Sequence, residues 1–219
     1  MTNRNNKENL EKAYSISVVT TIDNLPYPSS VSKENVKIYE VSDSDIPQNY
    51  GGINREKYSY GELRRQPIIP EILTSMVKNE TLREYANACN ERNKHKGFQM
   101  HLINGEYSFW GLRVGPVIHA PSVEELRQIL NKEPKTAIAL KNKEVTEDMI
   151  RSISYSLLRR VIGEECGMSE KEAGSAIGKQ LDCVPHEDEA GYIYMVPNWA
   201  HNWFRHKGYV SKVLPRLNS

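Results

Sequence analysis

Apolar residues recur with two different periods along this chain, and the change of period predicts an α+β fold. Runs rich in β-branched and aromatic residues predict strands. These runs cover 14–22, 36–41, the two arms of a hairpin within 98–115, 136–140, 181–188 and 192–197. Apolar residues spaced three and four positions apart predict helices. The helical segments begin after Pro70, at 122, at 146, at 169 and near 198.

Local signals at the ends of several elements support these assignments. Asn104-Gly105 lies between two β-prone runs, which is typical of a two-residue hairpin turn. The segments Ser122–Glu125 and Ser169–Glu172 have the spacing of a capping box, in which a serine and a glutamate bond to each other's backbone at the start of a helix. Both segments precede an apolar periodic run, so we expect a helix to begin at each of them.

A break in the hydrophobic pattern near 141–144 suggests two domains. Residues 1–12 are polar and are expected to form a disordered leader. Residues 13–142 predict a mixed α+β region whose sequence indicates no role. Residues 145–219 predict a second, smaller domain in which two helices lead into a strand, a turn, a strand and a short helix.

Charge and composition exclude some classes of protein. The chain has 219 residues, with 29 basic and 28 acidic side chains and a net charge of +1, so a wholly basic surface for nucleic acid is not indicated. No run approaches the roughly 18 apolar residues of a membrane helix, and the N-terminus lacks the apolar core of a signal peptide. We therefore expect a cytoplasmic protein without membrane insertion. Three isolated cysteines predict free thiols rather than a disulfide framework.

Three of the six histidines are grouped near the C-terminus. They are His186, His201 and His206. Five residues separate the last two, which corresponds to about 500° of rotation on an ideal helix, so they share a site only where the helix frays. A hairpin return can bring His186 to the same place. The spacing alone leaves open whether these imidazoles bind a metal ion or pack in the structure.

The same segment is basic and aromatic. From Ala190 to Ser219 there is no acidic residue. Cationic and aromatic side chains together suit a phosphate backbone, although aromatic residues at these spacings are also typical of a core. The candidate contacts with nucleic acid are Arg205, Lys207, Lys212 and Arg216.

The stretch HEDEAGYIYMVPNWAHNWFRHKGYVSKV resembles the C-terminal toxin nucleases of the HNH/endonuclease VII superfamily, the His-Me finger domains of bacterial polymorphic toxins. The resemblance covers about 35 residues near 181–214. It includes a His-Glu segment, a strand that ends in Met-Val-Pro, an Ala-His helix start and a terminal His-Lys-Gly. Pro185 stands where that family has tryptophan, and His186 stands where relatives often have two histidines.

The resemblance implies a ββα-metal fold and hydrolysis of phosphodiester bonds with one divalent ion, which is Mg²⁺, Mn²⁺, Ni²⁺ or Zn²⁺. It implies that His186 is the general base that activates a water molecule. It implies that His201 is a metal ligand, that His206 is a second metal ligand or a phosphate contact, and that Asp182, Glu187 or Asp188 completes the shell. Arg205 and Lys207 would hold the scissile phosphate or its neighbours.

The function expected from this resemblance is that of a bacterial endonuclease toxin or effector, with DNA favoured over RNA as substrate. A cognate immunity protein and delivery to a target cell by a non-classical secretion system are expected from the resemblance alone. Two alternatives stay open. One is a finger that has lost catalysis and binds nucleic acid, which the single histidine favours. The other is a protein-interaction module with a packed Trp/His helix.

Overall fold

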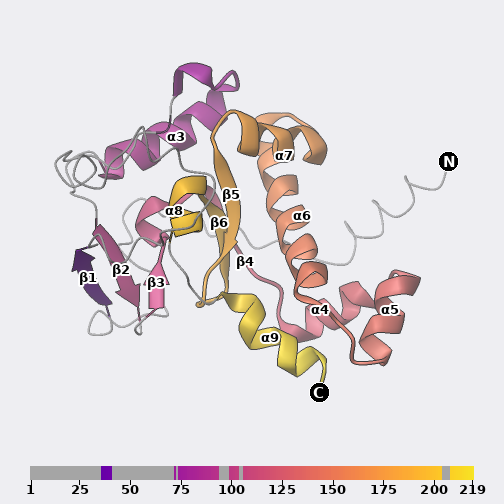
Figure 1. The fold of residues 1–219 in the computed structure, drawn as a ribbon. Coiled ribbons are helices and arrows are strands. Elements are labelled where there is room, and N and C mark those ends of the chain that lie inside the picture. The colour runs from indigo at the N-terminus through magenta and orange to yellow at the C-terminus, as the bar shows by residue number, and fades with distance from the viewer. Residues whose placement is uncertain (1–35, 41–71, 73, 94–98, 104–105, 204–207) are drawn as a thin grey trace.

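The computed structural model of this α+β protein describes residues 36–40, 72, 74–93, 99–103, 106–203 and 208–219 (Figure 1). The strands are β1 (Val36–Glu40), β2 (Gln99–Ile103), β3 (Glu106–Ser108), β4 (Val114–His119), β5 (Cys183–Glu187) and β6 (Tyr192–Pro197). The helices are η3 (Thr74–Met76), α3 (Glu80–Asn93), η4 (Trp110–Leu112), α4 (Val123–Leu130), α5 (Pro134–Lys141), α6 (Glu147–Cys166), α7 (Glu170–Lys179), α8 (Asn198–Trp203) and α9 (Tyr209–Leu217).

These strands form two three-stranded antiparallel sheets. One sheet has the order β1-β2-β3, which confirms the predicted strand at 36–41 and the two arms of the predicted hairpin. The other has the order β4-β6-β5, so β6 is its central strand. In that sheet β6 pairs with β5 from Cys183↔Pro197 to Glu187↔Ile193. The last predicted elements, a strand, a turn, a strand and a short helix, are therefore confirmed as β5, β6 and α8.

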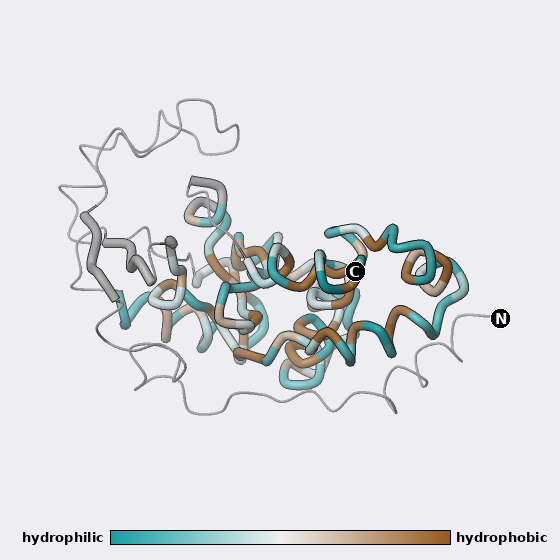
Figure 2. The backbone as a smooth tube through the Cα atoms, turned by 90° about the horizontal axis from the view of Figure 1, so that it is seen from below, coloured by the Kyte–Doolittle hydropathy of each residue, from teal (hydrophilic) through white to brown (hydrophobic). Residues whose placement is uncertain are grey.

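The larger hydrophobic core lies on one face of the sheet β4-β6-β5. Helices α3, α6 and α7 cover that face, whereas α8 lies on the other side (Figure 1). Leu82 of α3, Leu158 of α6 and Ile177 of α7 pack with Ile193 and Met195 of the central strand in one cluster of buried residues. Figure 2 shows hydrophobic and hydrophilic residues alternating along the helical coils, as expected when each helix buries one side.

A second core joins α4, the start of α6 and α9. Its members include Leu126, Ile150 and Val213, all buried. The Asn218 side chain accepts a hydrogen bond from the Val145 N–H at 3.0 Å and donates one to the Val145 carbonyl at 3.0 Å. This reciprocal pair fixes the end of α9 beside the start of α6.

The predicted boundary near 141–144 does not separate two cores. Strand β4 precedes the boundary, yet it pairs with β6, with Val114 opposite Met195 and His119 opposite Tyr192. The larger core likewise mixes residues from both sides of the boundary. The sheet that holds the C-terminal hairpin therefore depends on a strand from the region 13–142.

Two secondary-structure predictions differ from the structure. Residues 136–140 were expected as a strand but belong to α5, which has Pro134 in its first turn and exposes Ile138. Proline fits the first turn of a helix because the N–H it lacks has no intrahelical partner there. Helix α9 was not predicted, and it contains Pro215. The predicted leader 1–12, the strand at 14–22 and the turn at 104–105 lie outside the described residues.

Both predicted capping boxes are present. At α7 the Ser169 hydroxyl accepts a hydrogen bond from the Glu172 N–H, and the Glu172 carboxylate accepts one from the Ser169 N–H at 2.8 Å. The Ser169 hydroxyl also donates to the Glu172 carboxylate, and this bond and the one from the Ser169 N–H lower the pKa of the Glu172 carboxyl. At α4 the pair Ser122 and Glu125 makes the same contacts.

Replacing Ser169 by alanine is expected to lower the free energy of unfolding by about 1 kcal/mol, because the first turn of α7 loses a side-chain acceptor. Urea denaturation followed by circular dichroism measures the change. Ser175 of the same helix is exposed, so Ser175→Ala is the matched control and is expected to leave stability nearly unchanged. Equal effects of the two substitutions would contradict the capping role.

Within the part of the chain that the structure describes, none of the helices has both the length and the apolar character that crossing a bilayer requires.

Candidate functional site

The alternation of side chains along β5 and β6 sorts the C-terminal hairpin into two faces. Neighbouring residues of a strand point to opposite faces of a sheet, and residues opposite each other on paired strands share a face. His186 is opposite Tyr194, and Glu187 is opposite Ile193. His186 and Tyr194 therefore share the face covered by α8, whereas Glu187 belongs to the face covered by α6.

A three-residue loop connects the two strands of this hairpin. Gly191 has φ +85°, in the left-handed region that glycine adopts without strain. The Asp188 N–H donates to the Tyr192 carbonyl at 2.9 Å, and the Gly191 N–H donates to the Asp188 carbonyl at 3.2 Å. A three-residue loop that ends in a left-handed glycine is a common hairpin connection. It sets the register that places His186 opposite Tyr194.

Two of the three grouped histidines meet on the α8 face. The imidazole of His186 in β5 and the imidazole of His201 in α8 have ring centroids 5.6 Å apart. Phe109, which precedes η4, packs against both rings, with centroid distances of 4.9 Å to His186 and 6.1 Å to His201. His186 is only 2% exposed, and His201 is half-buried.

Behind the histidine pair lies a buried group of polar side chains. The Tyr194 ring packs against His186 at 5.3 Å, and burial and the neighbouring Asp188 carboxylate raise the pKa of the Tyr194 hydroxyl. Arg113 is 3% exposed and stacks 4.7 Å from the centroid of the Trp110 ring. The Arg113 guanidinium acts in the opposite direction on the Tyr194 pKa, so these charged groups lie near one another.

Asp188 is a buried carboxyl at the end of β5. Burial raises its pKa to about 6, although N–H groups of the hairpin loop oppose the shift. One of them, the Tyr192 N–H, donates to Asp188 Oδ1 at 3.0 Å. The carboxyl is thus held by the loop that it helps to form.

Glu187 is not brought together with the histidine pair. It is buried on the face that α6 covers, close to Ser154, and burial raises its pKa while Ser154 and Arg151 lower it. Its carbonyl oxygen also lies where a side chain on Gly208 would be, because a Cβ on Gly208 would come within 2.6 Å of it. The close approach of the α9 N-terminus to β5 therefore requires glycine at this position.

Asp182 is also separate from the pair. It is exposed, precedes β5 and accepts a 3.5 Å hydrogen bond from the Asn198 side chain. Asp182 precedes β5, whereas Glu187 ends it, and the strand between them spans about 13 Å. One metal ion therefore cannot bind both carboxylates.

The predicted basic contacts are only partly described. Lys212 is exposed, forms a 3.0 Å ion pair with Glu189 and donates to the Glu189 carbonyl at 2.9 Å. Glu189 lies just before the acid-free segment, so it offsets one of the four positive charges counted there. Arg216 is exposed, and its carbonyl accepts a hydrogen bond from the Arg127 side chain at 2.6 Å. Arg205, His206 and Lys207 lie outside the described residues.

The described donors fit a metal ion only in part. Two imidazoles bound to one tetrahedral ion at about 2.0–2.1 Å have ring centroids roughly 5–6 Å apart, and the pair His186–His201 matches this separation. Among the described residues, however, no group of three or more His, Cys, Asp or Glu side chains is arranged to hold a metal ion. The described part of the chain thus supplies a pair of imidazoles but not a third side chain that completes a group of ligands with them.

Sequence reasoning did not single out Phe109, Arg113 or Tyr194 for this site. Phe109 and Arg113 precede β5 by about 70 positions, and the pairing of β4 with β6 brings Phe109 to the histidines and Arg113 to Tyr194. No local pattern signals that pairing. Tyr194 could have been predicted from the sequence, since the alternation of side chains along a hairpin puts it on the same face as His186.

Comparisons with models of protein families, with curated proteins and with solved structures found no match to this chain.

Proposed function

We propose that this protein is a metal-dependent endonuclease of the His-Me finger type. One observation carries the proposal. The β5–β6 hairpin and the helix α8 that follows it bring His186 and His201 to 5.6 Å of each other, in the ββα order that the sequence resemblance implies. The resemblance rests on residues 181–214, and the geometry puts two of its histidines in one place.

In this proposal His186 is the general base and not a metal ligand, because an imidazole nitrogen bound to the ion cannot also accept a proton. The 5.6 Å separation of its ring from that of His201 is then that between the base and a ligand of the ion beside it. Phosphodiester hydrolysis needs a water molecule that loses its proton as it attacks phosphorus, and a neutral imidazole accepts a proton near neutral pH. Phe109 and Tyr194 pack against the His186 ring and fix its orientation. A base held in one orientation loses little entropy when the substrate arrives.

His201 is the described residue that would hold the metal ion, with His206 as the second ligand predicted from the sequence. The bound ion would stabilise the charge on the phosphoryl oxygens and on the leaving alkoxide. Asp188 belongs to the same buried neighbourhood as Tyr194 and supports the hairpin loop. Glu187 is left out of this assignment because it lies on the opposite face of the sheet, and Asp182 because it lies before the other end of β5.

A second candidate function is a finger without catalysis that binds nucleic acid. The observation that favours it is the burial of His186, which is 2% exposed beneath aromatic rings. A general base must reach the proton that it abstracts, and a fully packed histidine acts only as a structural residue. Both candidates predict an interaction with nucleic acid that weakens steeply as salt increases.

Incubating the whole chain with supercoiled plasmid and with a structured RNA, each with Mg²⁺, Mn²⁺, Ni²⁺ or Zn²⁺, tests the proposal. We expect plasmid nicking with at least one ion and none with EDTA. Salt-dependent binding without cleavage under any ion would replace the endonuclease by the second candidate. If neither cleavage nor salt-dependent binding is observed, the protein-interaction module is the remaining candidate.

A cognate immunity protein, synthesis in the cytoplasm of the producing cell and delivery into a target cell belong to the same proposal and rest on the resemblance alone. Co-expression offers a direct check. A catalytically active toxin should be poorly tolerated by a host that lacks its immunity protein, and His186→Ala should relieve that toxicity.

A further inference from the structure

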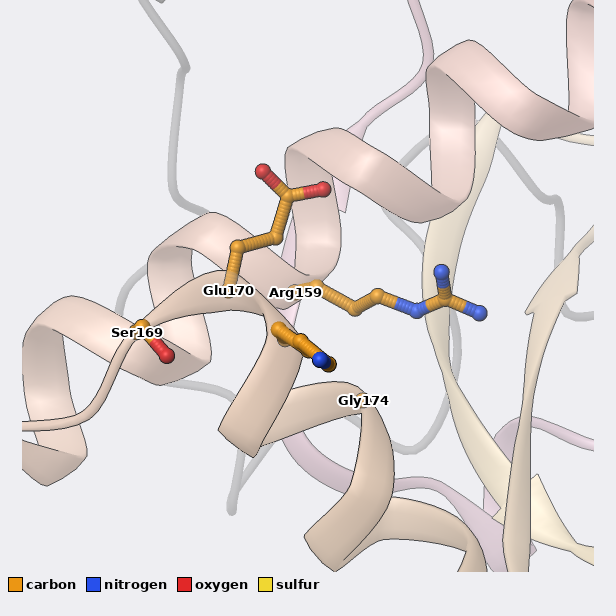
Figure 3. Close-up of a pocket in the computed structure, with 5 residues that line it drawn as sticks. Arg159, Ser169, Glu170 and Gly174 are labelled. Carbon is orange, nitrogen blue, oxygen red and sulfur yellow. The ribbon is translucent and has the colours of Figure 1, made fainter. Parts of the chain in front are cut away.

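A separate polar cavity lies between α6 and α7. It has a volume of about 490 Å³ and is lined by Arg159, Ser169, Glu170, Lys171 and Gly174 (Figure 3). Its lining includes two cationic side chains and the first turn of the ten-residue helix α7. The positive end of a helix dipole favours an anion nearby.

Arg159 has an unusual place in this cavity. Its side chain lies across α7 at Gly174, where an added Cβ would meet Arg159 Nε at 3.1 Å and Cδ at 3.2 Å. Glycine is a poor helix former, so its presence inside α7 makes room for this arginine. The Arg159 Nε is buried and makes no hydrogen bond to any described residue. The Arg159 side chain as a whole is only partly buried, and its terminal guanidinium nitrogens, unlike Nε, are open to an acceptor that an anionic ligand would supply.

The carboxylates near the cavity are already engaged. Glu170 accepts a 2.7 Å hydrogen bond from the Ser156 hydroxyl, and Figure 3 shows its carboxylate extending in a different direction from the Arg159 guanidinium. Glu172 accepts the N–H and hydroxyl bonds of Ser169 in the capping box. Arg159 and Lys171 form no ion pair with a carboxylate among the described residues, so the lining keeps two positive groups against the one negative charge of Glu170.

We propose that this cavity binds a small ligand that carries a phosphate monoester. Such a group bears a charge of about −1.5 to −2 near pH 7 and three acceptor oxygens, which matches one guanidinium and one ammonium. The planar donors of arginine suit two phosphate oxygens at once, while lysine contributes a point charge.

This cavity is distinct from the histidine pair. Helices α6 and α7 cover the face of the sheet opposite to the one that carries His186 and α8 (Figure 1). A phosphate bound at Arg159 would therefore not be the group that His186 attacks. The proposal stands independently of the proposed nuclease activity.

Calorimetric titration of the whole chain at low ionic strength, with inorganic phosphate and with ribose 5-phosphate, tests the proposal. Changes in the NMR chemical shifts of the backbone amides of residues 169–174 show whether the ligand binds at this cavity. We expect saturable binding at one site. Arg159→Gln should weaken it about tenfold and Lys171→Gln about threefold. Lys179→Gln, which removes an exposed lysine at the far end of α7, should bind as the unaltered protein does.

Gly174→Ala is a variant that keeps every charge. The added methyl group displaces the Arg159 side chain, so binding should weaken although alanine favours the helix. Absence of saturable binding up to about 20 mM phosphate would overturn the proposal. Unchanged affinity in all three cavity variants would also overturn it. So would a result in which the monoesters fail to bind while a DNA duplex without terminal phosphates binds in an Arg159-dependent way.

Discussion

Replacing His186 by glutamine should lower the rate of plasmid cleavage about 100- to 10,000-fold, because a general base contributes a factor of this size. Glutamine is close to imidazole in volume and can still pack against Phe109 and Tyr194, but it cannot accept a proton from water near neutral pH. Cleavage is measured at saturating metal ion and plasmid, so that the change reports the chemical step rather than binding.

His119 provides the matched control for this substitution. It is an exposed histidine on β4 whose ring lies 5.0 Å from Tyr192, outside the pair. His119→Gln should cleave at nearly the unaltered rate. Because His186 is buried, near-ultraviolet circular dichroism must first show that His186→Gln keeps its aromatic packing. A folded His186→Gln protein that cleaves plasmid as fast as His119→Gln would exclude His186 as the base.

Replacing Asp188 by asparagine should flatten the pH dependence of stability between about pH 4 and pH 7. Burial raises the pKa of the folded-state carboxyl from 3.8 to about 6, so the folded protein holds this proton more tightly than the unfolded chain. Its contribution to stability is therefore complete below the unfolded pKa and is lost as pH rises through the folded pKa. The loss amounts to about 3 kcal/mol for a shift of this size.

Asparagine keeps an oxygen acceptor for the Tyr192 N–H while removing the ionisation. Urea denaturation at pH 4, 5, 6 and 7 gives the difference in the free energy of unfolding between variant and unaltered protein. That difference should move in favour of Asp188→Asn as pH rises. Glu187, whose pKa burial also raises, is present in both proteins and cancels. The exposed Asp182 supplies the control, and a pH trend in Asp182→Asn as large as in Asp188→Asn would contradict the assignment.

Local patterns predicted most of the elements described here. The capping boxes at Ser169 and Ser122 predicted where α7 and α4 begin, because the two partners of each cap are three residues apart in the sequence. The prediction of a strand at 136–140 was wrong because it gave the β-branched and apolar residues more weight than Pro134, which favours the start of a helix. Helix α9 was not predicted because it contains Pro215. Its stability comes from the packing of Val210, Val213 and Leu217 rather than from local propensity.

The candidate site was predicted to the extent that it is local. His186 and His201 are joined by one hairpin and one helix start, so their meeting follows from short-range structure. The assignment of Glu187 to the metal shell conflicts with strand alternation, which the sequence could have revealed once β5 was recognised. Phe109 and Arg113 could not be anticipated, because a pairing between strands about 75 residues apart brings them in.

The central position of β6 has a consequence for how the protein is made. Until residue 197 has been synthesised, β4 has no neighbour in its sheet, and Leu82 and Leu158 lack the strand against which they pack. The apolar surface of α3 that packs on this strand therefore waits for about 100 further residues, and that of α6 for about 30, exposed or shielded by a chaperone. A fragment that starts at 145 would in turn leave one edge of β6 unpaired and open to association with another chain.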